Sequence, residues 1–180
     1  EKLEELTALQ VDVAEDEYNK AQDAYSTDRM ILIGGLIVAG RRGHFAGSMP
    51  PDLGVRDGRL KAPSVTRNSV SSQADYWRDA PQRHYAKIAP LRYDGDPAAA
   101  MQRLIAVLKK FDGASIVEVR PDYVYAQFTT RWLRFVDDVE FLLAPGEGVI
   151  HLRSASRLGH EDLGCNRRRV EAIRAEFDAA

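Results

Sequence analysis

Four strand-like runs in the second half of the chain constrain its fold most. They span residues 115–120, 123–132, 136–143 and 149–154. In the second and third runs every other residue is apolar, which is the period of a strand with one buried face. A five-residue, glycine-containing loop at 144–148 separates the last two runs and is typical of a β-hairpin. The pattern predicts a four-stranded antiparallel sheet.

Two predicted helices flank these strands. Asp96 is the predicted N-cap of the first helix, Pro97 takes its first position, and its apolar residues recur at helical spacing before Asp112. Asn166 is the predicted N-cap of the second helix, which carries three arginines in its first turn and one apolar stripe. We therefore expect the α+β class: a four-stranded antiparallel sheet packed by two helices in two layers, preceded by an extended N-terminal helix.

The N-terminal part has a different composition. Residues 1–29 contain nine acidic and three basic residues and no proline or glycine, so they predict a charged helix. An uncharged apolar run of eleven residues follows at 30–40, which is shorter than the roughly 20 residues that a transmembrane helix needs. The sequence predicts three parts: a charged helix with a short apolar, anchor-like segment at 1–40, a linker rich in glycine, proline and arginine at 41–63, and the α+β domain at 64–180.

Composition excludes several classes of site. The net charge of −2 gives no global cationic field for nucleic acid, so no nucleic-acid partner is expected. Cys165 is the single cysteine, which excludes a disulfide framework and a cysteine-rich zinc site. The common nucleotide-binding and metal-binding motifs do not occur, so no metal and no cofactor is expected.

Charged residues gather in the third and fourth runs. If Phe141 faces the core, Glu140 and Asp138 lie on the opposite face, beside either His151 or Arg153 according to the register. This cluster is interpreted first as a cross-strand ladder of ion pairs. A ligand-binding or catalytic site is the second interpretation. A metal site is the third, with Asp137, Asp138, Glu140, His151 and His160 as its ligands.

Four blocks of the sequence resemble the domain-of-unknown-function family 1499 over roughly residues 41–180. They are NSVSSQA at 68–74, KIAPLRY at 87–93, FVDDVEFLL at 135–143 and RSASRLGHEDLGCNRRRVEAIR at 153–174. The resemblance implies no established activity, and it implies a bacterial or plastid protein with an N-terminal membrane segment. Many members carry cysteine where this chain has Ser69, and a second cysteine near Pro63, so a thiol function of those members does not extend to this chain.

Residues 8–40, in contrast, resemble the membrane-proximal end of the sensor helix of bacterial chemoreceptors. This resemblance and the apolar run at 30–40 indicate a protein of the cell envelope, associated with a membrane through residues 30–40.

Three hypotheses of function follow. The first is a non-catalytic binding module for a small anionic ligand or a lipid headgroup, since arginines bind carboxylates and phosphates. The second is a hydrolase-like enzyme that uses the carboxylates of Asp137, Asp138 and Glu140. The third is a structural or interaction domain. The candidate ligand-binding residues are Asn68, Ser71, Ser72, Gln73, Asp137, Asp138, Glu140, Arg153, Ser156, Arg157, Arg168 and Arg169.

Overall fold

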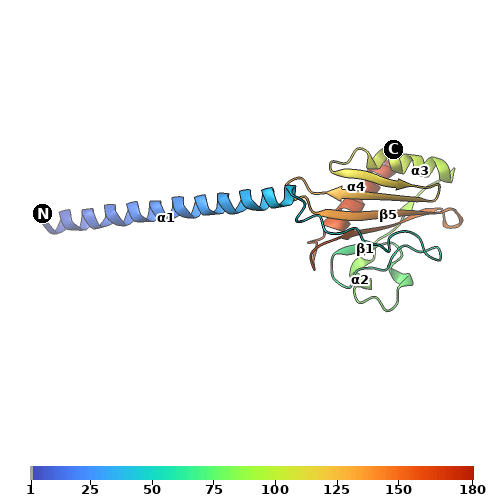
Figure 1. Ribbon diagram of the computed structural model, residues 1–180, viewed down its shortest axis with the longest axis horizontal. Coiled ribbons are helices and arrows are strands. Elements are labelled where there is room, and N and C mark those ends of the chain that lie inside the picture. The colour runs from blue at the N-terminus through green and yellow to red at the C-terminus, as the bar shows by residue number, and fades with distance from the viewer. Residues whose placement is uncertain (1) are drawn as a thin grey trace.

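The computed structural model describes the backbone of residues 2–180 and the side chains of residues 16–180. A single long helix, α1, extends away from a domain in which a sheet is packed by helices (Figure 1). The elements in chain order are α1 (Lys2–Arg41), β1 (Ser69–Ser71), η1 (Ala74–Tyr76), α2 (Arg83–Ala86), β2 (Leu91–Arg92), α3 (Pro97–Leu108), β3 (Ala114–Val119), β4 (Tyr123–Thr129), β5 (Val136–Ala144), η2 (Pro145–Glu147), β6 (Val149–Ser156) and α4 (Cys165–Asp178).

The sheet is antiparallel and has the order β1-β6-β5-β4-β3, with β2 also paired to β6. The predicted α+β class is confirmed, and the four predicted strands are β3 to β6. The predicted strand count is too low, because β1 and β2 form where no strand was predicted. These strands contain only three and two residues, too few to show an alternating pattern, and they form because β6 offers a free edge.

One face of the sheet carries the main core. Alternate residues of β4 and β5, among them Val124, Val139 and Phe141, pack against α3 and α4, and all three are fully buried. The predicted alternation, with apolar residues on one buried face, is therefore confirmed along the length of β4. The second run was predicted to continue to Trp132, but the strand ends at Thr129 and Trp132 is 56% exposed. The turn that follows includes Arg134 at a φ of 60°, which breaks the extended backbone.

The two helices of the domain are capped differently. Asp96 caps α3 as predicted, since its Oδ2 accepts a hydrogen bond from the backbone nitrogen of Ala99 at 2.8 Å. Asn166 does not cap α4; it lies in the first turn and is fully buried. Asp162 accepts hydrogen bonds from the backbone nitrogens of Gly164 and Asn166 instead, both at 2.9 Å. Gly164, at a φ of 78°, lets the chain bend so that Asp162 reaches the helix end.

The second face of the sheet is covered by the chain segment 41–63, here called the arm. Leu60 is fully buried among Tyr123, Tyr125 and Leu142 of the sheet, and the backbone nitrogen of Gly54 donates a hydrogen bond to Glu140. The segment predicted as a linker thus contacts the sheet over much of its length. The division of the chain into domains at residue 64 stays a prediction.

The apolar run at 30–40 continues the same helix as the acidic residues before it. Within the part of the chain that the structure describes, no helix is both long and apolar enough to cross a membrane.

Replacing Asp96 by alanine removes the side-chain cap of α3. We expect the free energy of unfolding to fall by about 1 kcal/mol, because a backbone N–H of the first turn loses its acceptor. Urea denaturation followed by circular dichroism measures this change. Asp79→Ala, at an exposed loop position, is the control and should change stability by much less. Equal losses in the two variants would contradict the capping role.

Candidate functional site

The charged residues of β5 divide between the two faces of the sheet. Asp137 lies on the face that packs against α4, whereas Asp138 and Glu140 lie beneath the arm. The register pairs Glu140 with Arg153, which decides between the two registers that the sequence allowed. All three carboxylates are buried, so the cluster is not a solvated ladder of ion pairs.

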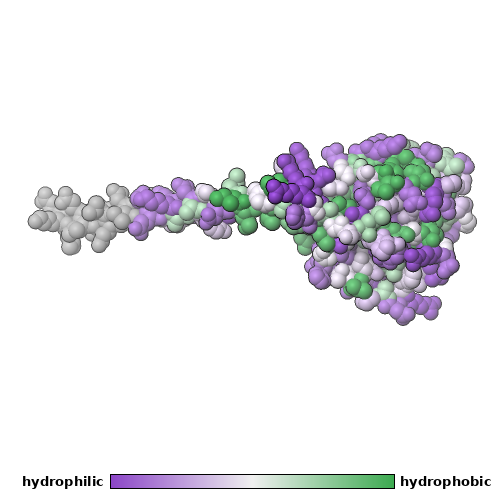
Figure 2. All heavy atoms as spheres, viewed as in Figure 1, coloured by the Kyte–Doolittle hydropathy of each residue, from purple (hydrophilic) through white to green (hydrophobic). Residues whose placement is uncertain are grey.

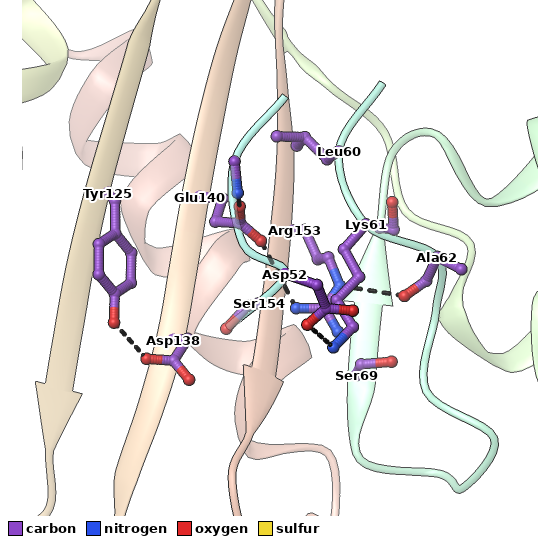
Figure 3. A network of polar contacts seen from close by, with 12 residues as sticks. Asp52, Leu60, Lys61, Ala62, Ser69, Tyr125, Asp138, Glu140, Arg153 and Ser154 are labelled. Carbon is purple, nitrogen blue, oxygen red and sulfur yellow. Dashed lines mark hydrogen bonds and ion pairs between the residues drawn. The ribbon is translucent and has the colours of Figure 1, made fainter. Parts of the chain in front are cut away.

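Glu140 and Arg153 form a buried pair under the arm (Figure 3). The Oε1 atom of Glu140 accepts hydrogen bonds from the backbone nitrogen of Gly54 at 2.7 Å and from the hydroxyl of Tyr123 at 2.9 Å. The Nε atom of Arg153 donates to the carbonyl of Ala62 at 3.2 Å. The remaining atoms, Glu140 Oε2 and Arg153 Nη1, are 3.6 Å apart, and neither has a hydrogen-bond partner among the described residues.

Burial dominates the electrostatics of this pair. It raises the pKa of Glu140 above its ordinary value, although Gly54, Arg153 and Tyr123 each act in the opposite direction. Burial also lowers the pKa of Arg153, against the attraction of Glu140. Loss of solvation therefore disfavours the charged form of both groups, and each charge depends on the other for compensation.

Asp138 is bound by Arg157 and Tyr125. The guanidinium of Arg157 donates to both carboxylate oxygens, from Nη2 to Oδ1 at 2.7 Å and from Nε to Oδ2 at 3.0 Å. The hydroxyl of Tyr125 donates to Oδ1 at 2.6 Å, and burial together with this carboxylate raises the pKa of Tyr125. Because this bidentate pair already uses the charge of Arg157, little of it remains for an external anion.

Asp137 forms an ion pair with Arg169 of α4. Arg169 also donates from Nη1 to Asn166 Oδ1 at 2.8 Å and to Ser154 Oγ at 3.1 Å. Asn166 donates in turn to the backbone carbonyl of Asn68 at 3.1 Å and to Ser156 Oγ at 2.9 Å. Asp137 is thus the acidic partner of Arg169. Arg168 lies apart from this network, since it is exposed and bonds to Leu163 and Cys165.

The polar residues that follow Asn68 in the sequence form hydrogen bonds to the arm and to their own backbone. Gln73 accepts a hydrogen bond from the backbone nitrogen of Leu60 at 2.8 Å and donates to the carbonyl of Gly58 at 3.2 Å, which fixes the arm. Ser71 Oγ accepts from the backbone nitrogen of Gln73 at 3.1 Å. These contacts explain the burial of Ser71 and Gln73 without a ligand.

Ser72 contacts His151 of β6. Ser72 Oγ lies 3.1 Å from His151 Nδ1, and His151 Nε2 lies 3.4 Å from Glu147. The same oxygen accepts a hydrogen bond from the backbone nitrogen of Leu152 at 2.9 Å. Ser72 therefore joins the end of β1 to β6, and its oxygen accepts a hydrogen bond from the backbone.

Two cavities lie beside these networks. The first, of about 400 Å³, is lined by three of the predicted residues, Asp137, Ser156 and Arg169. Glu161 and Asp162 also line it, so its carboxylates outnumber its arginine and its charge does not favour an anion. The second, here called the arm cavity, has a volume of about 210 Å³. Its lining residues are Asp52, Gly54, Arg56, Arg59, Leu60, Lys61, Ala62 and Trp77.

None of the residues that line the arm cavity was among the predicted site residues. The basic residues at 56, 59 and 61 were the only sign of this cavity in the sequence. They were not considered as site residues because they lie in the segment predicted as a linker. Among the described residues, no three histidine, cysteine or carboxylate side chains are grouped so that they could hold a metal ion.

The structure therefore defines an α+β domain whose sheet has an apolar face under two helices and a charged face under an arm. Residues 59–177 match the model of the family described as Protein of unknown function (DUF1499), and the chain belongs to this family. The resemblance noted for the four sequence blocks is thereby confirmed. No curated protein matches the chain. Residues 8–40 lie outside the matched range, and their resemblance to chemoreceptors stays a prediction.

A double-mutant cycle tests the dependence of Glu140 and Arg153 on each other. Arg153→Met leaves Glu140 as a buried carboxylate without a counter-charge, so we expect it to destabilise the protein by about 3 kcal/mol. Glu140→Gln should cost less, because burial already disfavours the charge that this substitution removes. Because the double variant buries no charge, it should cost at least about 1 kcal/mol less than the sum of the single variants. Chemical denaturation measures all four proteins; strictly additive losses would show that the two side chains do not interact.

The pH dependence of stability should have opposite signs at Glu140 and Asp162. The folded pKa of Glu140 is raised, so its contribution is complete below 4.5, its ordinary value, and is lost as the pH rises through the folded pKa. Burial alone would raise the pKa of Asp162, but hydrogen bonds from Asn166, Tyr85 and Gly164 lower it. Its contribution is present above 3.8, its ordinary value, and is lost as the pH falls through the folded pKa.

Denaturation over a range of pH measures these contributions. The difference in stability between the wild type and Glu140→Gln should shrink toward high pH, and that between the wild type and Asp162→Asn should shrink toward low pH. The same sign in both variants would contradict the assignment of one raised and one lowered pKa.

Proposed function

We propose that this protein is a membrane-proximal, non-catalytic binding module that attaches to anionic lipid headgroups. The observation that carries the proposal is the exposure of an apolar stretch of α1 beside a tryptophan-bearing loop of the domain. The apolar stretch comprises residues 30–39, and the loop comprises residues 131–135. Together they are called the apolar patch below.

The first part of the apolar stretch, residues 30–36, is exposed on every side of the helix. Met30, Ile31 and Leu32 are 71%, 69% and 64% exposed, and consecutive residues of a helix point in directions about 100° apart. A protein groove would cover only one side of such a helix, whereas lipid surrounds it. Figure 2 shows this stretch as a band of hydrophobic residues where α1 approaches the domain.

The domain contributes the second part of the apolar patch. Trp132 and Leu133 line a groove of about 440 Å³ together with Ile33, Leu36 and Ile37 of α1. The helix and the loop therefore form one continuous apolar surface. Tryptophan is enriched at the boundary between lipid and water, because its ring is apolar and its indole nitrogen can bond to the headgroups.

Arginines border the apolar patch. Arg29, Arg41 and Arg42 lie at the ends of the apolar stretch, and Arg131 and Arg134 lie on either side of Trp132 and Leu133. Each basic residue near an anionic lipid surface contributes about 1 kcal/mol of attraction. The excess of acidic residues over 1–29 disfavours contact of that part with the same surface, so we assign contact to residues 29–42 and to the loop.

The dimensions favour attachment at the interface. The ten helical residues of the apolar stretch extend about 15 Å, and the hydrocarbon core of a bilayer is about 30 Å thick. The apolar stretch is thus long enough to enter one leaflet. An enzyme that uses the β5 carboxylates is less well supported, because each carboxylate is buried and already paired with an arginine.

Co-sedimentation with vesicles tests this function. We expect the protein to pellet with vesicles that contain phosphatidylglycerol and to remain in the supernatant with phosphatidylcholine alone. Trp132→Ala should weaken binding about tenfold, because a large apolar side chain no longer enters the interface. Tyr18→Ala, which removes an exposed aromatic ring from the acidic part of α1, is the matched control and should bind as the wild type does. Equal pelleting with both vesicle types, or equal losses in both variants, would refute the proposal.

A further inference from the structure

We propose that the arm cavity is a binding site for a small oxyanion, such as phosphate or a short carboxylate. The site goes beyond the proposed attachment to lipid, and it uses none of the residues of the apolar patch. Three observations support it: two opposed arginines, an excess of positive charge, and a hydrogen-bond donor of the wall that has no partner among the described residues.

The two arginines are placed opposite each other by a tight turn. The backbones of Arg56 and Arg59 exchange hydrogen bonds of 2.9 and 3.0 Å. The two residues between them, Asp57 and Gly58, have positive φ values of 51° and 69°, which is typical of the turn of a two-residue hairpin. Both arginines line the arm cavity. Like charges directly opposite each other destabilise a strand pair, and a bound anion would remove this cost.

The charge of the cavity is positive. Arg56, Arg59 and Lys61 line it together with one carboxylate, Asp52. Lys61 pairs with Asp52 at 2.5 Å, and its hydrogen bond lowers the pKa of that carboxyl. Neither arginine forms an ion pair with another described residue, and Arg59 only stacks on the ring of Tyr76. Two guanidinium groups, which bind carboxylates and phosphates in a bidentate manner, therefore remain for a ligand.

One residue of the cavity wall carries a hydrogen-bond donor without a partner. The indole nitrogen of Trp77 is buried and has no acceptor among the described residues. A buried donor without an acceptor is costly, and an oxyanion supplies several acceptors. The volume of about 210 Å³ is below the range of sites for drug-sized molecules, so the ligand is small.

The fluorescence of Trp77 tests the proposal directly. The chain has two tryptophans, and Trp132→Phe leaves Trp77 as the single reporter. We expect a saturable change in its emission when this variant of the full chain is titrated with inorganic phosphate or with citrate at constant ionic strength, and none with chloride. In the same background, Arg56→Gln should weaken binding about tenfold, since it removes a charge-assisted hydrogen bond.

Arg92→Gln is the matched control. It removes the same charge from an exposed position of β2 outside the arm cavity and should bind as its parent does. Thermal unfolding without ligand should show that both variants fold, and Arg56→Gln should be at least as stable as its parent because the repulsion from Arg59 is gone.

Three results would overturn the proposal. They are no saturable response to phosphate or citrate, equal loss of binding in Arg56→Gln and Arg92→Gln, and a response only to vesicles that contain phosphatidylglycerol. The last result would mean that the arm cavity binds a lipid headgroup and not a free oxyanion. Vesicle sedimentation of Arg56→Gln separates this test from the test of the proposed function. Arg56 is not part of the apolar patch, so this variant should pellet with vesicles as its parent does.

Discussion

The buried pair of Glu140 and Arg153 is the interaction on which the arrangement of the arm and the sheet depends. Moving two charges out of water costs several kcal/mol each, and their attraction offsets this cost only when other polar groups satisfy them. The arm supplies such groups, the backbone nitrogen of Gly54 and the carbonyl of Ala62. The segment is thus held in place by the charges that it covers, and the register of β5 and β6 places these two residues opposite each other.

The two faces of the sheet serve different purposes as a result. The face under α3 and α4 supplies most of the apolar core, while the face under the arm combines a smaller apolar cluster with the buried pairs of Glu140 and Asp138. Asp138 and Asp137 extend the same principle, since each is paired with an arginine from another element, Arg157 of the chain after β6 and Arg169 of α4. The charged residues that dominate the sequence blocks of this family are mostly engaged within the protein. The groups that remain accessible to a ligand or a surface lie in the arm cavity and in the apolar patch.

Under the two proposals, these surfaces have separate tasks beside a membrane. The apolar patch would provide hydrophobic attachment together with charge attraction from its arginines. The arm cavity is formed by different elements and has its own charge. One surface would position the domain at a membrane, and the other would bind a small anion there, with no shared residue and therefore no need for the two events to be coupled.

The sequence by itself determined the class of the fold, the capped helix α3, the four longer strands and the apolar face, because these depend on local periodicity and capping. It also placed Asp138 and Glu140 on one face, but it left their partners open and did not show that they would be buried. Tertiary structure decided the register, the strands β1 and β2, the capping of α4 by Asp162 and the covering of the charged face by the arm. Each of these depends on residues far apart in the chain. The charged side chains are buried only when those segments pack against each other, and local sequence patterns do not show this packing.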